Sequence, residues 1–272
     1  MDYQLIVFDM DGTLLRSDKT VSPAVLSAVR EAVCAGKSVA LGTGRPVTEL
    51  FPYKTEFADF RYAVLESGAL VYDLQEKTIL LRRVLDPACI PAVLEAIPQE
   101  DIMPQAMCGG VSYINADDLP RMKHYYMGVY ETLYETSATR VPDICVFLRE
   151  HADQIEKINL YHASEEGRER TNVRLSGQPI ERIYAETTSL EISPPGINKG
   201  SGLQDLCALL GIDASEAIAV GDADNDIPML RAAGLGIAMG NANGHVLAAA
   251  DVVVSDNDHD GCAEAIREYL LR

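Results

Sequence analysis

The chain lacks the clustered cysteines and histidines from which zinc and redox sites are commonly built. Six cysteines are scattered over 272 residues without a C-x-x-C pair, and the five histidines form no H-E-x-x-H pattern. These spacings provide no support for a zinc site or a dithiol redox motif. We therefore expect free thiols in a reducing compartment.

Basic residues are also scarce. The chain has 23 Lys and Arg against 41 Asp and Glu, which gives a formal net charge of -18. Binding to a nucleic-acid backbone calls for a basic patch, so we expect no nucleic-acid partner. An anionic substrate would be repelled by such a chain unless a metal cation dominated the field at the site.

Long apolar runs are missing as well. No run approaches the roughly 18 residues that a membrane-spanning helix needs. The start of the chain, Met1-Asp2-Tyr3, shows no basic region followed by an apolar one, so no secretory signal is expected. We expect a cytoplasmic protein with no membrane partner.

Short apolar runs are present, and several end abruptly in polar residues. Leu5 to Phe8 is followed by Asp9 and Asp11, and similar runs lead into Gly42-Thr43-Gly44-Arg45 and into Gly221-Asp222-Ala223-Asp224-Asn225-Asp226. Such runs are too short for helices and predict buried strands. If the strands are parallel, their polar ends meet at the edge where open α/β sheets bind ligands.

The segments between these runs predict the fold class. Helical patterns are expected over residues 22–35, from about Val47, and over residues 201–210, 227–233 and 262–271. Strands that alternate with helices indicate a parallel sheet with right-handed crossovers. The regular alternation of strands and helices stops after a predicted hairpin at residues 70–84. We therefore predict a Rossmann-like α/β core from residues 1–84 and 190–272, with an inserted α+β module at residues 85–189.

The polar residues at the predicted strand and helix ends form a chemically coherent set. Asp9, Asp11 and Asp222 offer the hard oxygen ligands that Mg²⁺ prefers. Thr43 and the backbone amides after it, beginning at Gly44, can cradle phosphate oxygens. Lys199 adds a point charge. Together they match the needs of phosphoryl transfer, where catalysis is mostly positioning and charge stabilisation.

Each element alone has a simpler interpretation. Residues 222–226 resemble the start of an EF-hand, but Ile227 stands where that loop needs Gly and Ala233 where it needs Glu. Residues 196–201 imitate a P-loop with Gly and Lys in the wrong order. Lys199 alone could be a surface lysine, and Thr43 alone a turn residue. Their occurrence together, each beside a strand or helix end, is far more specific.

Four motifs resemble those of the haloacid dehalogenase-like phosphatases: D-M-D-G-T at 9–13, T-G-R at 43–45, N-K-G at 198–200 and G-D-A-D-N-D at 221–226. The segments E-I-S-P-P-G-I-N-K-G at 191–200 and A-M-G-N-A at 238–242 are similar to the Cof-type subfamily, which carries a large α+β cap. The resemblance implies that the inserted module is such a cap, which closes over the core, excludes water and selects the substrate.

The resemblance also assigns catalytic roles. Asp9 would be the nucleophile that accepts the phosphoryl group as an aspartyl-phosphate, and it would also bind the metal. Asp11 would protonate the leaving alcohol, later activate water, and ligate Mg²⁺ through its backbone carbonyl.

The remaining motif residues would bind phosphate or metal. Thr43, Gly44 and Lys199 would hold the phosphoryl oxygens, and Asn225 would hydrogen-bond near the phosphate and Lys199. Asp222 would ligate the metal directly. Asp226 would do so through water or support the other ligands.

Three positions depart from the family pattern or stay undecided. Glu66-Ser67-Gly68 stands where the family often has Asn-Gly, so a substrate contact from Ser67 would differ. His259 stands where an acid is common. Arg45 could contact substrate or hold its loop in place.

The resemblance implies a Mg²⁺-dependent phosphatase, a phosphoric monoester hydrolase that acts on a small phosphorylated metabolite. A sugar phosphate is the first expectation, followed by a nucleotide or a phosphorylated cofactor. Two alternatives stay open: a phosphotransferase or phosphomutase that passes the group to a second hydroxyl, and a non-catalytic protein that binds a phosphorylated metabolite.

Overall fold

The computed structural model describes residues 2–185 and 187–272, which form two compact units. The first unit combines Met1–Gly44, Tyr53–Leu81 and Asn198–Arg272. The second combines Arg45–Pro52 and Arg82–Ile197. The second unit is thus mainly one long insertion, with a short excursion of the chain at residues 45–52 added to it.

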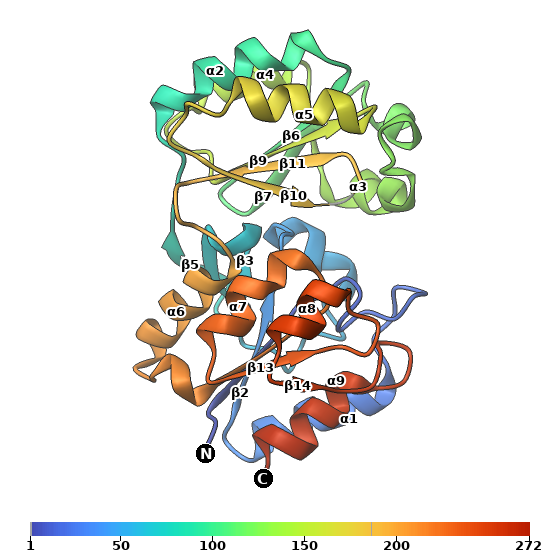
Figure 1. Cartoon of the computed structure of the whole chain (residues 1–272), viewed down its shortest axis with the longest axis vertical. Coiled ribbons are helices and arrows are strands. Elements are labelled where there is room, and N and C mark those ends of the chain that lie inside the picture. Colours follow the sequence, from blue (N-terminus) through green and yellow to red (C-terminus); the bar gives the residue numbers. More distant parts are fainter. Residues whose placement is uncertain (1, 186) are drawn as a thin grey trace. The chain divides into compact units, whose positions relative to one another are not determined.

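The first unit is built on an eight-stranded, mostly parallel sheet (Figure 1). The strands follow the order β14 (Val252–Val253), β13 (Leu235–Ala238), β12 (Ala217–Gly221), β1 (Leu5–Phe8), β2 (Ser38–Gly42), β3 (Tyr62–Leu65), β4 (Leu70–Asp73) and β5 (Thr78–Arg82). The pairs from β14 to β3 are parallel, and β4 turns back antiparallel to β3. The predicted α/β class with a parallel-sheet core is confirmed.

Helices pack against this sheet because its central strands are apolar on both faces. All four residues of β1 are fully buried, and Leu5 and Val7 share a core cluster with Leu203 and Met229. The helices are α1 (Pro23–Cys34), α6 (Lys199–Leu210), α7 (Ile227–Ala232), α8 (Gly244–Ala249) and α9 (Gly261–Ala265), the last continued by a π-helical turn at Ile266–Leu270. Helix α1 begins at an N-cap, Ser22, followed by Pro23, as the sequence predicted.

The second unit contains a six-stranded sheet, antiparallel except where β7 meets β8. Its order is β10 (Glu181–Ala185), β11 (Ser189–Ser193), β9 (Lys157–His162), β6 (Ile102–Cys108), β7 (Val111–Asn115) and β8 (Thr139–Val141). Helices α2 (Ile90–Ala96), α4 (Ile144–Glu150) and α5 (Glu165–Arg174) lie along one side of this sheet, and α3 (Glu131–Ser137) lies on the other (Figure 1).

Alternation along the central strand explains the two different faces of this sheet. In β9, Ile158 and Leu160 belong to the apolar core that also contains residues of α2 and α4. Lys157, Asn159 and Tyr161 are buried on the opposite face, and Asn159 donates a 2.7 Å hydrogen bond to Gln105. One face of the sheet therefore packs on an apolar core, and the other carries buried hydrogen-bonded polar side chains beside a second apolar cluster that includes Met103, Tyr134 and Tyr161.

The helix expected from about Val47 is a 3₁₀ helix, Val47–Tyr53, with Pro52 inside it. Proline has no N–H to donate, so a regular α-helical hydrogen bond is missing at that position. Among the described residues, no helix combines the length and apolar character needed to cross a membrane.

Candidate active site

Three neighbouring strands of the first unit bring the predicted acids to one edge. Strand β1 lies between β12 and β2, with Phe8 in register with Val220 on one side and Leu41 on the other. The parallel direction of all three places Asp9, Thr43 and Asp222 just beyond the carboxyl ends of adjacent strands. The Asp9 amide donates a 3.0 Å hydrogen bond to the Val220 carbonyl, which fixes the exit of β1 against β12.

Lys199 connects two of these acids. Its Nζ lies 2.5 Å from Asp9 Oδ1 and 2.6 Å from Asp226 Oδ1, and its side chain is 2% exposed. Lys199 is the first residue of α6, where the side chain of Asn198 caps the helix by accepting hydrogen bonds from the amides of Gly200 and Ser201. The cap sets the start of the helix and thereby the origin of the lysine side chain.

Asp226 uses its second oxygen to organise its own loop. Its Oδ2 accepts 3.0 Å hydrogen bonds from the amides of Asp222 and Ala223. Asp222 Oδ1 in turn accepts a 2.7 Å hydrogen bond from Thr13 Oγ1. Thr13 stands in the D-M-D-G-T motif, but no function was predicted for it. Its position within that motif is the sequence feature from which a role in the site could have been predicted.

Burial and neighbouring charges shift the pKa values of the ionisable groups in this cluster. Burial raises the pKa of Asp9 well above its ordinary value, Asp226 raises it further, and Lys199 acts in the opposite direction. Burial also raises the pKa of Asp222 to about 6. For Lys199, burial disfavours the charge, but Asp226 and Asp9 outweigh burial and raise its pKa.

The donor set fits a divalent cation. Asp9, Asp222 and Asp226 each offer a carboxylate oxygen, and these oxygens lie within 4.8 Å of one another. In their ionised forms the three acids would carry three negative charges against the one positive charge of Lys199. A divalent cation would balance the remainder, and carboxylate oxygens are the ligands that Mg²⁺ accepts.

Asp11 lies beside this cluster and forms a salt bridge with Lys19. Its Oδ1 accepts a 2.7 Å hydrogen bond from Lys19 Nζ, and the Asp11 side chain is 29% exposed. Gly12, which follows Asp11, has φ +83°, and a Cβ there would come within 2.4 Å of Asp222 Oδ2. Only glycine suits both the turn and that approach. Lys19 was not predicted as a site residue.

Thr43 and Gly44 follow β2 at the same edge. The Thr43 amide donates a 2.8 Å hydrogen bond to the Val64 carbonyl, and the Thr43 carbonyl accepts one of 3.1 Å from the Ser67 amide. Asn225 lies in the loop after β12, and its Oδ1 is buried without a hydrogen-bond partner among the described residues. An unsatisfied buried oxygen in this loop is consistent with a ligand contact.

Arg45, His259 and Ser67, whose roles the sequence did not determine, lie in different surroundings. The Arg45 guanidinium belongs to the second unit, 5.8 Å from the ring centroid of Tyr130. His259 is exposed, with Nδ1 2.6 Å from Asp256 Oδ1. Ser67 meets Thr43 through its backbone amide.

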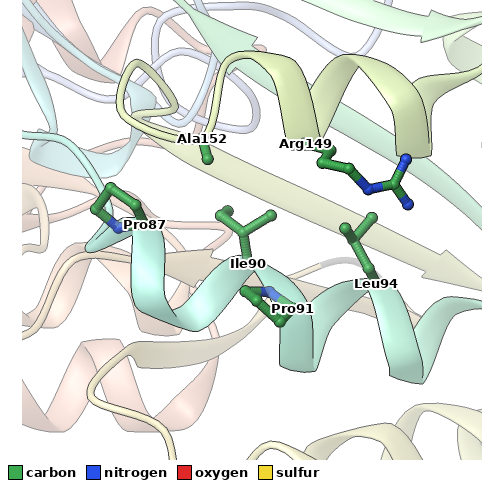
Figure 2. A pocket seen from close by; sticks show the side chains of 6 residues that line it. All are labelled: Pro87, Ile90, Pro91, Leu94, Arg149 and Ala152. Carbon is green, nitrogen blue, oxygen red and sulfur yellow. The ribbon is translucent and has the colours of Figure 1, made fainter.

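A shallow pocket of about 440 Å³ in the second unit offers no comparable chemistry (Figure 2). It is lined by Pro87, Ile90, Pro91, Leu94, Arg149 and Ala152, which come from the segments around α2 and α4. Among its described lining residues Arg149 alone is ionisable, so they provide neither an acid–base pair nor a set of metal ligands.

Comparison with known proteins gives a consistent family. The family model for haloacid dehalogenase-like hydrolases matches residues 6–266. A solved haloacid dehalogenase-like hydrolase from B. subtilis superimposes with a TM-score of 0.86 at 25% identity, covering 98% of this chain and 100% of that one.

Several curated relatives are similar along nearly the whole chain. A 5-amino-6-(5-phospho-D-ribitylamino)uracil phosphatase of Bacillus subtilis is 30% identical, with 98% of this chain and 97% of that protein covered. The pyridoxal phosphate phosphatase of Escherichia coli is 28% identical over all of both chains. A chloroplastic endoribonuclease of Arabidopsis thaliana is 30% identical to this chain. The match covers 99% of this chain and 47% of that protein.

Proposed function

The chain belongs to the haloacid dehalogenase-like hydrolases, and we propose that it is a Mg²⁺-dependent phosphatase of a small phosphorylated metabolite, acting through an aspartyl-phosphate. The observation that carries this proposal is the buried Asp9–Lys199–Asp226 arrangement, with Asp222 at the same strand edge. It combines a carboxylate nucleophile with the positive charge that an anionic substrate requires.

We assign the chemical steps to Asp9 and Asp11. The Asp9 carboxylate attacks phosphorus, and the bond from phosphorus to the alcohol oxygen breaks as Asp11 donates a proton to that oxygen. The ionised Asp11 then takes a proton from water, which attacks the aspartyl-phosphate and releases inorganic phosphate. Asp11 is more exposed than Asp9, which suits a group that must exchange protons with both the alcohol and water.

Charge and orientation come from the surrounding residues. Lys199 holds Asp9 in place by its hydrogen bond and offsets the charge of the phosphoryl group. Thr43 Oγ1 and the Gly44 amide would bind phosphoryl oxygens, with Asn225 close by. Mg²⁺, held by Asp9, Asp222 and the Asp11 carbonyl and supported by Asp226, would supply further charge neutralisation at the phosphoryl group.

A sugar or polyol phosphate is the substrate class that we propose first. The relative from Bacillus subtilis is named for a substrate with a phosphorylated ribityl chain, and the one from Escherichia coli for pyridoxal phosphate. We further propose that the core comprises about residues 1–84 and 190–272, and that the inserted α+β cap selects the substrate. A screen for phosphate release over sugar phosphates, polyol phosphates, nucleotides and pyridoxal phosphate would rank these classes.

Asp9→Asn tests the mechanism, with Asp59→Asn as a control for the loss of a carboxylate elsewhere in the first unit. We expect Asp9→Asn to lose Mg²⁺-dependent hydrolysis of para-nitrophenyl phosphate and to form no acid-trapped phosphoenzyme. Asp59→Asn should keep both. Wild-type turnover in Asp9→Asn would overturn the proposal. Recovery of a phosphorylated isomer instead of free phosphate would favour the phosphotransferase alternative.

A further inference from the structure

The turn that follows β3 has an unusual backbone. Glu66, Ser67 and Gly68 all have positive φ, at 54°, 58° and 105°. Glu66 and Ser67 carry side chains and are buried, at 0% and 1% exposure. Such a conformation is unfavourable for residues with a Cβ and persists where the surrounding structure enforces it.

One side of this turn holds Thr43. The Ser67 amide donates a 3.1 Å hydrogen bond to the Thr43 carbonyl, and the Thr43 amide donates one of 2.8 Å to Val64, just before the turn. Both backbone groups of Thr43 are therefore tied to β3 and its exit. The left-handed conformations of Glu66 and Ser67, on either side of the peptide that carries the Ser67 N–H, set the direction of that N–H and thus where Thr43 is held.

The other side of the turn lies against the start of α6. A Cβ on Gly68 would lie 2.1 Å from the Asn198 carbonyl oxygen, so only glycine permits this approach. One helical turn later, a Cβ on Gly202 would lie 2.8 Å from Gly68 Cα and 2.4 Å from Val64 Cγ1. The first turn of α6, which carries Lys199, thus rests directly on the Glu66–Gly68 turn.

We propose that the Glu66–Gly68 turn is a positioning element that sets the spacing between Thr43 and Lys199. The inference rests on the proposed function, in which these two residues hold the same phosphoryl group. Catalysis of phosphoryl transfer depends mainly on such positioning. A shift of either residue would therefore reduce the rate of the chemical step.

The first test compares Gly68→Ala with Gly36→Ala. Both glycines have positive φ, but a Cβ at Gly36 meets no atom within 4 Å, so Gly36→Ala introduces backbone strain without displacing a neighbour. We expect Gly68→Ala to lower kcat for para-nitrophenyl phosphate by about tenfold or more and to raise the inhibition constant of inorganic phosphate. Gly36→Ala should lower only the melting temperature.

A second pair covers the case in which Gly68→Ala does not fold. Gly202→Ala pushes α6 away from the turn without left-handed strain, and Gly244→Ala is a helical control with nothing within 4 Å of the added Cβ. We expect a loss of kcat in Gly202→Ala alone.

The outcomes separate the two proposals. The positioning role is tested once the wild-type enzyme is shown to hydrolyse phosphate esters. Folded Gly68→Ala or Gly202→Ala with the wild-type kcat and the wild-type inhibition by phosphate would then overturn it. A wild-type protein that hydrolyses no phosphate ester would overturn the proposed function itself, and if it still bound inorganic phosphate it would favour the non-catalytic alternative.

Discussion

Asp226 accepts a hydrogen bond from the backbone amide of Asp222, four residues earlier, at 3.0 Å. The same carboxylate contacts Lys199 through its other oxygen. The loop that carries Asp222 and the helix that carries Lys199 are therefore held together by one buried side chain.

Replacing Asp226 by Asn should damage both connections. An amide can offer its oxygen to the loop amides or to Lys199, but the NH₂ group must then face a second donor. Breaking a buried charge pair in this way costs about 3–5 kcal/mol of the free energy of unfolding. We expect urea denaturation to show this loss, together with strongly reduced turnover.

The exposed Asp224→Asn is a suitable control, because Asp224 lies in the same loop and contacts Asn243 instead of Lys199. It should unfold at nearly the wild-type urea concentration. An Asp226→Asn protein as stable as this control would show that the buried hydrogen bonds contribute little.

Thr13→Val should weaken metal binding without removing a proposed ligand. The hydroxyl of Thr13 orients Asp222 by a 2.7 Å hydrogen bond, and loss of such a supporting contact typically lowers metal affinity by about 10–100-fold. Titration calorimetry with Mg²⁺ would measure the change. Thr13→Ser keeps the hydroxyl and should restore most of the affinity. Equal affinity in Thr13→Val and the wild type would exclude this supporting role.

Low pH should destabilise the second unit because Glu100 becomes protonated. Hydrogen bonds from Arg170 and Arg174, at 2.6–2.8 Å, lower the pKa of Glu100 from 4.5 to about 2. A carboxylate with a depressed folded-state pKa adds stability that is present above pH 4.5 and is lost as the pH falls toward 2. The melting temperature should therefore drop across this window.

Glu100→Gln should melt lower than the wild type at pH 7, and the difference should shrink as the pH falls toward 2. Glu95→Gln, an exposed acid on α2, provides the comparison. A constant difference between Glu100→Gln and the wild type at all pH values would show that ionisation of Glu100 is not the cause.

The strand ends were the part of the site that could be predicted from sequence. Abrupt changes from apolar to acidic residues marked the ends of β1 and β12, and a parallel sheet then had to place Asp9 and Asp222 at one edge. The partners of these acids could not be predicted in the same way. Nothing in the sequence indicates that Lys199 divides its contacts between Asp9 and Asp226, because that depends on where the capped helix begins.

The turn after β3 was least predictable. Glu66 and Ser67 have no sequence preference for left-handed backbone, so only Gly68 hinted at it. Likewise, no break in composition marks the excursion at residues 45–52, because its short 3₁₀ helix resembles the start of an ordinary crossover helix.

The division of the chain into two units affects how the protein could be dissected. The backbone leaves the first unit after Gly44, returns at Tyr53, leaves again after Leu81 and re-enters at Asn198. The first and the last of these four crossings lie one residue from Thr43 and Lys199. Any splice that removes the second unit must therefore rejoin the chain beside its proposed phosphate ligands. A minimal core for solution work would be better made by trimming the surface of the second unit than by excising it. Grafting a foreign second unit would require matched junctions at all four crossings.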